Sequence, residues 1–337
     1  MDFNELIGEM TRGFANFYWG NIVMIVMGLI LIALAIFKEY EPVLLLPIGF
    51  GAILANLPPV LEMMAPAVLG TAEAPGFLKV LFDAGIANEL FPVLIFVGVG
   101  AMIDFTPLLK DPSMIFFGAA AQFGIFATFL VSILLLPLVL SPEQLAEPNI
   151  VIRLASAIGI IGAADGPTTL YVANHFNLKD YMAPISVAAY SYMSLVPVIQ
   201  PPVIRALTTR EERKIRMDYH GKRASKLALI LFPIITTLVA GIIVPMSAPL
   251  VGSLMFGNLV RECGVLERLS KTAQNELANL VTILLGLSIG STMLAENFLR
   301  WDTALIMALG LAAFVFDTAG GVLFAKFLNL FRKNKIN

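Results

Sequence analysis

Long uncharged apolar segments constrain this chain more than any other feature of its sequence. Five runs of at least 19 residues contain no Lys, Arg, Asp or Glu: 13–37, 112–142, 181–204, 227–260 and 277–295. A helix needs about 20 apolar residues to cross the hydrocarbon core of a bilayer. Only 14% of the 337 residues are charged, whereas soluble domains average about 25%. The sequence therefore predicts an all-α polytopic membrane protein rather than a soluble globule.

The apolar pattern predicts eight membrane-spanning segments. We expect them near 19–37, 42–57, 90–109, 113–141, 182–204, 227–245, 276–295 and 303–325. Stretches near 76–88, 151–175 and 248–260 are too short or too interrupted to cross simply. Before the first span, apolar residues recur at helical spacing, which predicts an amphipathic helix on the membrane interface over residues 1–18.

Charge is concentrated in one segment, 205–226, which contains eight Lys/Arg and three acidic residues. The positive-inside rule places such a loop in the cytoplasm, where it is also a plausible docking surface for a soluble partner or for anionic lipid. The sequence has no phosphate-binding glycine loop and no nucleic-acid-binding motif. Neither nucleotide-driven transport nor nucleic-acid binding is therefore expected.

Two pairs of segments resemble each other and indicate an internal repeat. The segment 45–58 resembles 247–260 at an offset of 202, which pairs Asn56 with Asn258. The segment 96–105 resembles the stretch around 285–294 at an offset of 190, which pairs Gly98 with Ser288. We expect two inverted halves, 19–204 and 227–337, since transporters of that kind bind ions on discontinuous helices near the midplane. Chance similarity between Gly-rich and Ala-rich helices is the alternative.

The stretch IGIIGAADGPTTLY (158–171) places a carboxylate inside an apolar region. Gly166 and Pro167 predict a break in the helix beside Asp165, because glycine accepts unusual backbone angles and proline removes an N–H. Intramembrane carboxylates usually mark ion paths. With carbonyl oxygens freed near Gly162 and the hydroxyl of Thr168, Asp165 is expected to bind a hard cation such as Na⁺. A water-exposed loop between two interfacial helices is the alternative interpretation.

Further polar residues lie in other apolar segments. Tyr190 and Tyr192 lie in the segment 186–202, which also contains Gln200. A phenol in a membrane cavity can donate a proton or orient a carbonyl, although buried tyrosines are more often structural. Asn56, Asn258 and Ser288 either coordinate an ion or cap and pack helices. The sequence leaves the roles of Asp104, Glu296 and Asp317 open.

Four motifs in this order resemble the β-subunit of the sodium-pumping, biotin-dependent decarboxylases. They are VGAMIDFTPLL, GIIGAADGPTTLY, VAAYSYMSLVPVIQPP and GSTMLAENFL. That family acts on oxaloacetate, methylmalonyl-CoA, glutaconyl-CoA or malonate, and the resemblance extends from about residue 20 to residue 333.

The resemblance implies a division of labour among subunits. A carboxyltransferase α-subunit would move CO₂ onto biotin on a carrier domain or subunit, with a small γ/δ-type membrane subunit completing the complex. The β-subunit would decarboxylate carboxybiotin, consume a proton and export Na⁺ across the cytoplasmic membrane of a bacterium or archaeon. It would assemble as a homotrimer whose protomers combine a scaffold with an elevator-like moving core.

The resemblance and the residue patterns together give the candidate site. Asp165, Tyr190 and Tyr192 are the candidate catalytic residues, and Tyr192 and Gln200 the candidate contacts to carboxybiotin. The candidate Na⁺ ligands come from both halves of the chain: Gly162, Asp165, Thr168, Asn56, Asn258 and Ser288.

The second half has no counterpart of the broken segment. At an offset of about 190, that counterpart would fall near position 355, and the family pattern continues there with an Asn/Gly/Ser motif. We therefore expect the chain to be C-terminally truncated relative to a complete two-repeat protein. A Na⁺-coupled carboxylate symporter would share the repeat and the broken helix, and a membrane scaffold without activity is a third possibility.

Overall fold

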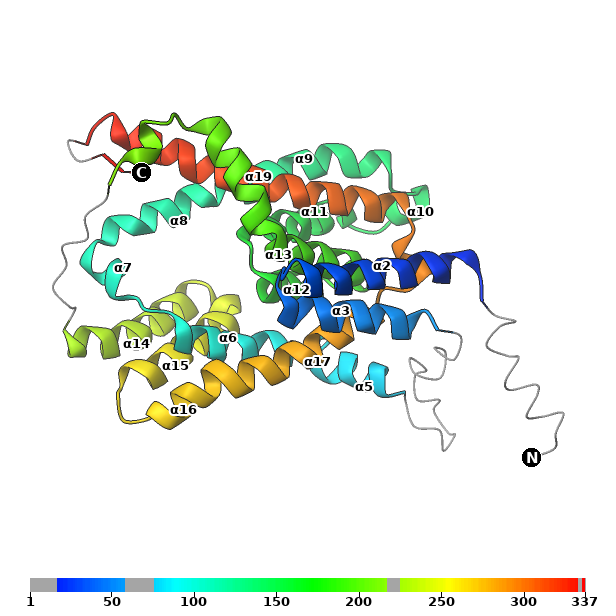
Figure 1. The fold of residues 1–337 in the computed structure, drawn as a ribbon, viewed down its shortest axis with the longest axis horizontal. Coiled ribbons are helices and arrows are strands. Elements are labelled where there is room, and N and C mark those ends of the chain that lie inside the picture. Colours follow the sequence, from blue (N-terminus) through cyan, green and yellow to red (C-terminus); the bar gives the residue numbers. More distant parts are fainter. Residues whose placement is uncertain (1–16, 58–75, 217–224, 333–334, 337) are drawn as a thin grey trace.

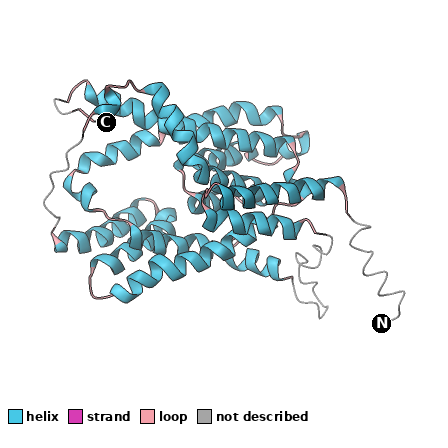
Figure 2. Ribbon diagram, in the orientation of Figure 1, coloured by secondary structure: helices cyan, strands magenta, loops and turns pink. Residues whose placement is uncertain are grey.

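The computed structural model describes residues 17–57, 76–216, 225–332 and 335–336. Within these ranges every regular element is helical (Figure 2). The predicted amphipathic helix over 1–18 and part of the basic segment lie outside the described residues. The principal helices are α2 (Trp19–Phe37), α3 (Pro42–Ala55), α5 (Phe77–Gly85), α6 (Leu90–Met102), α7 (Thr106–Lys110), α8 (Ile115–Ala121), α9 (Phe123–Leu135), α10 (Pro142–Leu145), α11 (Ile150–Ile160), α12 (Gly166–His175), α13 (Met182–Leu207), α14 (Lys226–Ile243), α15 (Ala248–Glu262), α16 (Glu267–Thr272), α17 (Ala278–Ser291), α18 (Ala295–Phe298) and α19 (Trp301–Asn329).

Helices occupy all the predicted spans, but fewer of them are long enough to cross a membrane alone. Among the described residues, four helical segments meet both the length and the apolarity needed: Trp19–Phe37, Pro112–Leu138, Lys226–Ile243 and Trp301–Asn329. A fifth span results if α5 and α6, which meet at 61°, cross as one bent pair. The sequence pattern indicates only an interrupted stretch in the α5 region and does not predict this bend.

The helices pack in two groups (Figure 1). In one group, α9 packs against α11 and α19, and α13 lies along α19. In the other group, α3 packs against α2 and α17, and α6 and α14 pack against α15. Helix α12 connects the groups, because it packs against both α13 and α6. The short helix that follows Asp165 therefore lies where the two groups meet.

Glycines permit the closest helix crossings in the second group. A Cβ on Gly51 of α3 would lie 2.6 Å from the carbonyl oxygen of Leu287 and 3.0 Å from Cα of Gly290. At the α6–α15 crossing, a Cβ on Gly257 would lie 2.9 Å from the amide nitrogen of Ala101. Small residues of this kind let membrane helices gain packing contacts along their backbones.

Replacing Gly290 by Ala is expected to destabilise the protein by about 1–3 kcal/mol, the usual cost of overpacking. The added methyl group would overlap the α3 backbone, since it would lie 2.8 Å from the amide nitrogen of Ala52. Thermal unfolding of the detergent-solubilised protein measures the effect as a lower Tm. Gly118→Ala in α8 is the matched control, because nothing lies within 4 Å of that position. Equal Tm values for the two variants would contradict the close crossing.

Both ends of α19 are attached to the rest of its group. At its C-terminal end, Lys326 donates a hydrogen bond to the Leu207 carbonyl oxygen at 3.0 Å and forms an ion pair with Glu212 at 3.2 Å. The backbone N–H of Thr209, followed by Lys326, holds the pKa of Glu212 below its usual value. Because these residues adjoin the basic segment, this is the end of α19 that we expect to face the cytoplasm.

The N-terminal end of α19 contains a buried carboxylate. Asp302 is only 4% exposed and pairs with Arg300 at 2.6 Å. Gln144 donates hydrogen bonds to both the Asp302 carboxylate and the Tyr181 hydroxyl. Burial, followed by the charge of Asp302, raises the pKa of Tyr181 to about 12. This network connects α10 and the start of α13 to the start of α19.

Candidate functional site

The interrupted helix predicted around Asp165 is present. Helix α11 runs into a 3₁₀ turn (Ile161–Ala163), and α12 begins at Gly166. The residue that turns the chain is Ala164, with φ 55° and ψ 36°, a left-handed conformation that costs a residue with a Cβ roughly 1–2 kcal/mol. The prediction that Gly166 and Pro167 break the helix was therefore wrong in detail. Pro167 lies in the first turn of α12, where its missing N–H has no helical partner to lose.

Asp165 is half-buried and caps the N-terminus of α12. One carboxylate oxygen accepts a hydrogen bond from the Thr168 backbone nitrogen at 3.1 Å, and the other accepts one from the Thr168 hydroxyl at 2.6 Å. The Asp165 carbonyl oxygen accepts a further bond from the Thr169 hydroxyl at 2.8 Å. Each carboxylate oxygen has a second lone pair that these bonds do not use. The group is thus held in place and can still accept a cation or a proton.

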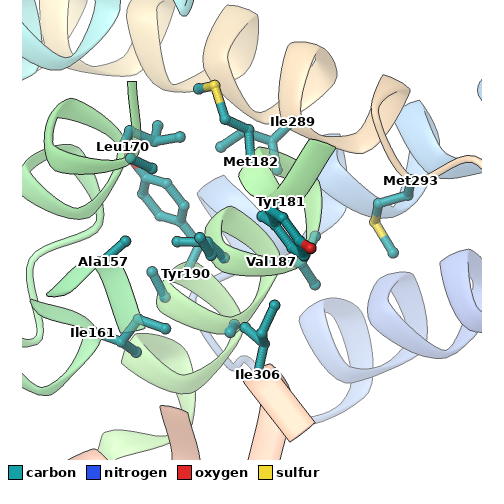
Figure 3. Packing of buried hydrophobic residues seen from close by; sticks show 14 of the residues in the cluster. Ala157, Ile161, Leu170, Tyr181, Met182, Val187, Tyr190, Ile289, Met293 and Ile306 are labelled. Carbon is teal, nitrogen blue, oxygen red and sulfur yellow. The ribbon is translucent and has the colours of Figure 1, made fainter. Parts of the chain in front are cut away.

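Tyr190 packs against the same break. Its side chain is 2% exposed, and its hydroxyl has no hydrogen-bond partner among the described residues. A Cβ on Gly166 would overlap the Tyr190 ring, which explains why the residue after Asp165 is glycine. The ring lies among Ala157, Ile161 and Leu170 (Figure 3). An unpartnered buried hydroxyl costs about 1–3 kcal/mol, so its place beside a carboxylate requires an explanation.

Tyr192 faces a different neighbour from Tyr190. Its hydroxyl donates to the Met307 carbonyl oxygen at 2.7 Å, and its ring packs edge-to-face with Phe314 at a centroid separation of 6.3 Å. Residues two apart on a helix do not share a face, so α13 presents Tyr190 to the break and Tyr192 to α19. Gln200 is exposed and lies about 15 Å further along α13 than Tyr190, toward the basic segment.

Asn56 and Asn258 make matching connections between helices. The Asn56 amide donates to the Ala52 and Met293 carbonyl oxygens at 2.8 and 2.7 Å, and its oxygen accepts from the Ala295 backbone. The Asn258 amide donates to the Gly100 and Ile103 carbonyl oxygens at 3.2 and 2.8 Å. Both amide groups are therefore bonded to backbone atoms in the conformation described, and each joins the end of one helix to its neighbour.

The remaining candidate ligands lie in packed positions. The fully buried Ser288 hydroxyl donates to the Leu284 carbonyl oxygen at 2.8 Å within α17. Gly162, in the turn before the break, faces α19, and a Cβ there would lie 3.2 Å from that of Ala313. The structure thus brings Asp165, Thr168 and Tyr190 together. It places Asn56 directly after α3 and Ser288 in α17, two helices that pack together, and Asn258 at the α6–α15 crossing.

The sequence did not predict the contacts that attach α12 to the second group. The Tyr171 hydroxyl donates to the Met246 carbonyl oxygen at 2.9 Å. The Asn174 amide donates to the Ala87 carbonyl oxygen at 3.1 Å and to the Glu89 carboxylate at 2.9 Å. Their spacing of three residues, which places two polar side chains on one face of a short apolar helix, was the available signal.

Comparison with known proteins identifies close relatives. A family model described as the Na⁺-transporting oxaloacetate decarboxylase beta subunit matches residues 20–337. The chain is 43% identical to a probable oxaloacetate decarboxylase beta chain of Vibrio cholerae, over 99% of this chain and 86% of that protein. It is 46% identical to the methylmalonyl-CoA decarboxylase subunit beta of Propionigenium modestum, over 97% and 83% of the two chains. It is also 46% identical to the glutaconyl-CoA decarboxylase subunit beta of Acidaminococcus fermentans, over 96% and 80%. The resemblance stated from the motifs is confirmed.

Proposed function

Because this chain belongs to the Na⁺-transporting oxaloacetate decarboxylase beta-subunit family, we propose that it decarboxylates carboxybiotin in a bacterial membrane and couples that reaction to Na⁺ transport. The observation that carries the proposal is the pairing of a capped carboxylate, Asp165, with the unpartnered buried phenol of Tyr190 at the helix break. The named relatives act on three different carboxylic compounds. The choice of substrate therefore lies with a partner subunit.

The reaction needs one proton. Decarboxylation breaks the bond between the biotin ring nitrogen and the carboxyl carbon, CO₂ leaves, and the electron pair that remains on nitrogen takes up a proton. Tyr190 is suited to hold or pass that proton because no protein acceptor within the described structure engages its hydroxyl. Tyr192 has a positioning role, because its hydroxyl already donates a hydrogen bond to a carbonyl oxygen of α19. Gln200, exposed nearer the cytoplasmic end of α13, is placed for a contact to the carrier-bound substrate.

Na⁺ is the cargo of this site. The carboxylate of Asp165 and the hydroxyl of Thr168 supply oxygen ligands, and the carbonyls of the turn that contains Gly162 lie beside them in the chain. A bound cation favours the ionised form of a carboxylate, whereas burial without a cation favours the protonated form. Na⁺ and H⁺ would then compete for one group. Such competition couples ion release to proton consumption without a nucleotide.

Asn56, Asn258 and Ser288 remain predicted Na⁺ ligands that lie on, or directly after, helices other than the one that Asp165 caps. Hydrogen bonds that their amide nitrogens and hydroxyl donate to carbonyl oxygens fix these side chains in place, and their side-chain oxygens are the atoms that would bind a cation. The matching bonds of the two asparagines support two related halves. An offset of 202 carries Asn56 to Asn258, and an offset of 190 carries Ile103 to Met293, the acceptors of the two amides. An elevator-like motion would move one helix group against the other, with α12 at the boundary.

The complex we propose contains a carboxyltransferase α-subunit, a biotin carrier, a small γ/δ-type membrane subunit and three copies of this chain. The basic residues that follow α13 support a cytoplasmic docking face for the soluble parts. Hydrogen bonds from Arg213 to the Thr208 backbone and hydroxyl hold the start of that segment against the end of α13.

Proteoliposomes that contain the chain with its partner subunits test the proposal. Loss of the carboxyl group from the carboxylated biotin carrier is measured with and without Na⁺. We expect Na⁺ to accelerate it severalfold and radioactive Na⁺ to accumulate only while carboxybiotin is supplied. If Na⁺ moves together with a free carboxylate in the absence of the carrier, the chain is a symporter and the proposal fails.

A further inference from the structure

A second carboxylate lies within the longest helix of the chain. Asp317 is on α19. The rise per residue of an α-helix places it about 24 Å from the beginning of that helix and about 18 Å from its C-terminal end. The side chain is half-buried, and it makes no hydrogen bond or ion pair within the described part of the chain. An ionisable residue at membrane depth is costly and is a functional candidate by default.

Asp317 lies close to the break beside Asp165. A Cβ on Gly124 of α9 would lie 2.6 Å from the Cβ of Asp317, so glycine is needed where α9 crosses this residue. One turn earlier on α19, Ala313 packs against Gly162, which is in the turn that leads to Asp165. The two intramembrane carboxylates are thus connected through one packed layer formed by α9, α19 and the 3₁₀ turn.

Two unusual hydroxyls continue from this point along α9. Thr128 and Ser132 lie one and two turns beyond Gly124, on the same face of the helix. Both side chains are fully buried, and neither hydroxyl has a hydrogen-bond partner among the described residues. Hydroxyls elsewhere in these helices bond to a carbonyl oxygen of the preceding turn, as those of Thr237, Thr282 and Thr318 do. The α9 hydroxyls therefore keep both donor and acceptor capacity in the layer that contains Asp317.

We propose that Asp317, Thr128 and Ser132 form a proton-transfer branch of the site. This inference rests on the proposed function, because it concerns the proton that decarboxylation consumes. The Asp317 carboxyl group gives up its proton and becomes a carboxylate, water molecules that bridge the carboxyl group and the two hydroxyls carry the proton along α9 to the break, and the biotin ring nitrogen receives it. Water then returns a proton to Asp317. A neutral carboxyl also avoids the cost of a charge in the apolar interior.

Few other charged groups face this layer. Helices α8 and α9 and the 3₁₀ turn contain no titratable residue, and α11 contributes only Arg153, which bonds to the Phe176 carbonyl oxygen. On α13 the titratable groups are Tyr190, Tyr192 and Arg205. On α19 itself, Asp302 and Lys326 are engaged at the two ends of the helix. The protonation of Asp317 is therefore governed by its apolar surroundings, by access to water and by the charge of Asp165, the other carboxylate connected to this layer.

The test uses the full complex in proteoliposomes, with variants Asp317→Asn and Asp317→Glu and the double variant Thr128→Val/Ser132→Ala. We expect Asp317→Asn to slow decarboxylation by about 100-fold, the lower end of what positioned proton transfer contributes, and to remove the fall in rate that wild type shows with rising pH as Asp317 loses its proton. The Na⁺ concentration for half-maximal rate should stay within about twofold of wild type, since the cation site is unchanged. Asp317→Glu should recover most of the rate, and the double variant should show a smaller loss of the same kind. Thr318→Val is the control on the same helix.

Infrared difference spectroscopy of the same complex gives a readout that does not need turnover. A carboxylic-acid C=O band that titrates with pH should be present in wild type and absent in Asp317→Asn. If the band is unchanged in that variant, or if the variant keeps the wild-type rate and pH profile, the proposal is overturned. A shift in Na⁺ half-saturation with an unchanged pH profile would instead make Asp317 a cation ligand and also overturns it. Absence of Na⁺-stimulated decarboxylation in wild type would contradict the proposed function, while the infrared band would still decide the state of Asp317.

Discussion

Replacing Asp165 by Asn is expected to abolish Na⁺-stimulated decarboxylation while leaving the fold in place. Asparagine caps helices about as well as aspartate does, so its side-chain oxygen can keep the bond from the Thr168 backbone that starts α12. What the variant loses is the negative charge for which Na⁺ and H⁺ compete. We expect the Na⁺-dependent rate to fall by more than about 100-fold, since charge at a site of this kind contributes several kcal/mol. Carboxybiotin turnover and the Tm of the purified complex are the measurements.

Thr168→Val separates the helix cap from the cation site. This variant keeps the backbone hydrogen bond to Asp165 and removes the hydroxyl that lies 2.6 Å from the other carboxylate oxygen. We expect a higher Na⁺ concentration for half-maximal rate, with a maximal rate close to wild type, because one neutral ligand is lost and the charge remains. If Asp165→Asn retained wild-type Na⁺ stimulation, or if both variants merely lowered Tm in parallel, Asp165 would be a helix cap and nothing more.

Most helix positions could be predicted because they follow from uncharged length alone. The predicted span 19–37 coincides with α2, and 227–245 differs from α14 by one or two residues at its ends. The predicted span 90–109 was too long, because α6 ends at Met102 and Asp104 accepts a hydrogen bond from the Thr106 backbone, which starts the separate helix α7. Local capping of this kind competes with an apolar pattern that reads as continuous.

The candidate site also combines residues that the sequence could predict with contacts that it could not. Asp165 and Thr168 could be recognised because their hydrogen bonds connect residues only three apart in the chain. The bonds of Asn56 reach residues more than 230 positions away, and no local pattern specifies such a partner. The left-handed turn at Ala164 was also unpredictable, because alanine rarely adopts it and tertiary packing has to impose it. Sequence patterns thus located the charged group but not the packing that surrounds it.

Tyr190→Phe is expected to lose most of the decarboxylation activity without losing stability. The Tyr190 hydroxyl has no partner within the described structure, so its removal breaks no hydrogen bond and relieves the cost of an unpaired polar group. The ring that fills the space beside Gly166 remains. We expect Tm to stay equal or to rise slightly, and the rate to fall by about 100-fold or more if the phenol passes the proton to biotin.

Tyr192→Phe is the matched control because its expected effects are the reverse. That hydroxyl donates to the Met307 carbonyl oxygen at 2.7 Å, and its loss should lower stability by about 1 kcal/mol. The rate should fall less than in Tyr190→Phe, since Tyr192 faces α19 and not the break. Both variants are measured for Tm and for the pH dependence of carboxybiotin turnover at saturating Na⁺. A Tyr190→Phe complex with wild-type turnover would remove the phenol from the mechanism and leave its unpaired hydroxyl as a feature of packing. The comparison separates these outcomes because the two tyrosines lie on opposite sides of one helix, and the two variants differ only in the groups that the lost hydroxyl could reach.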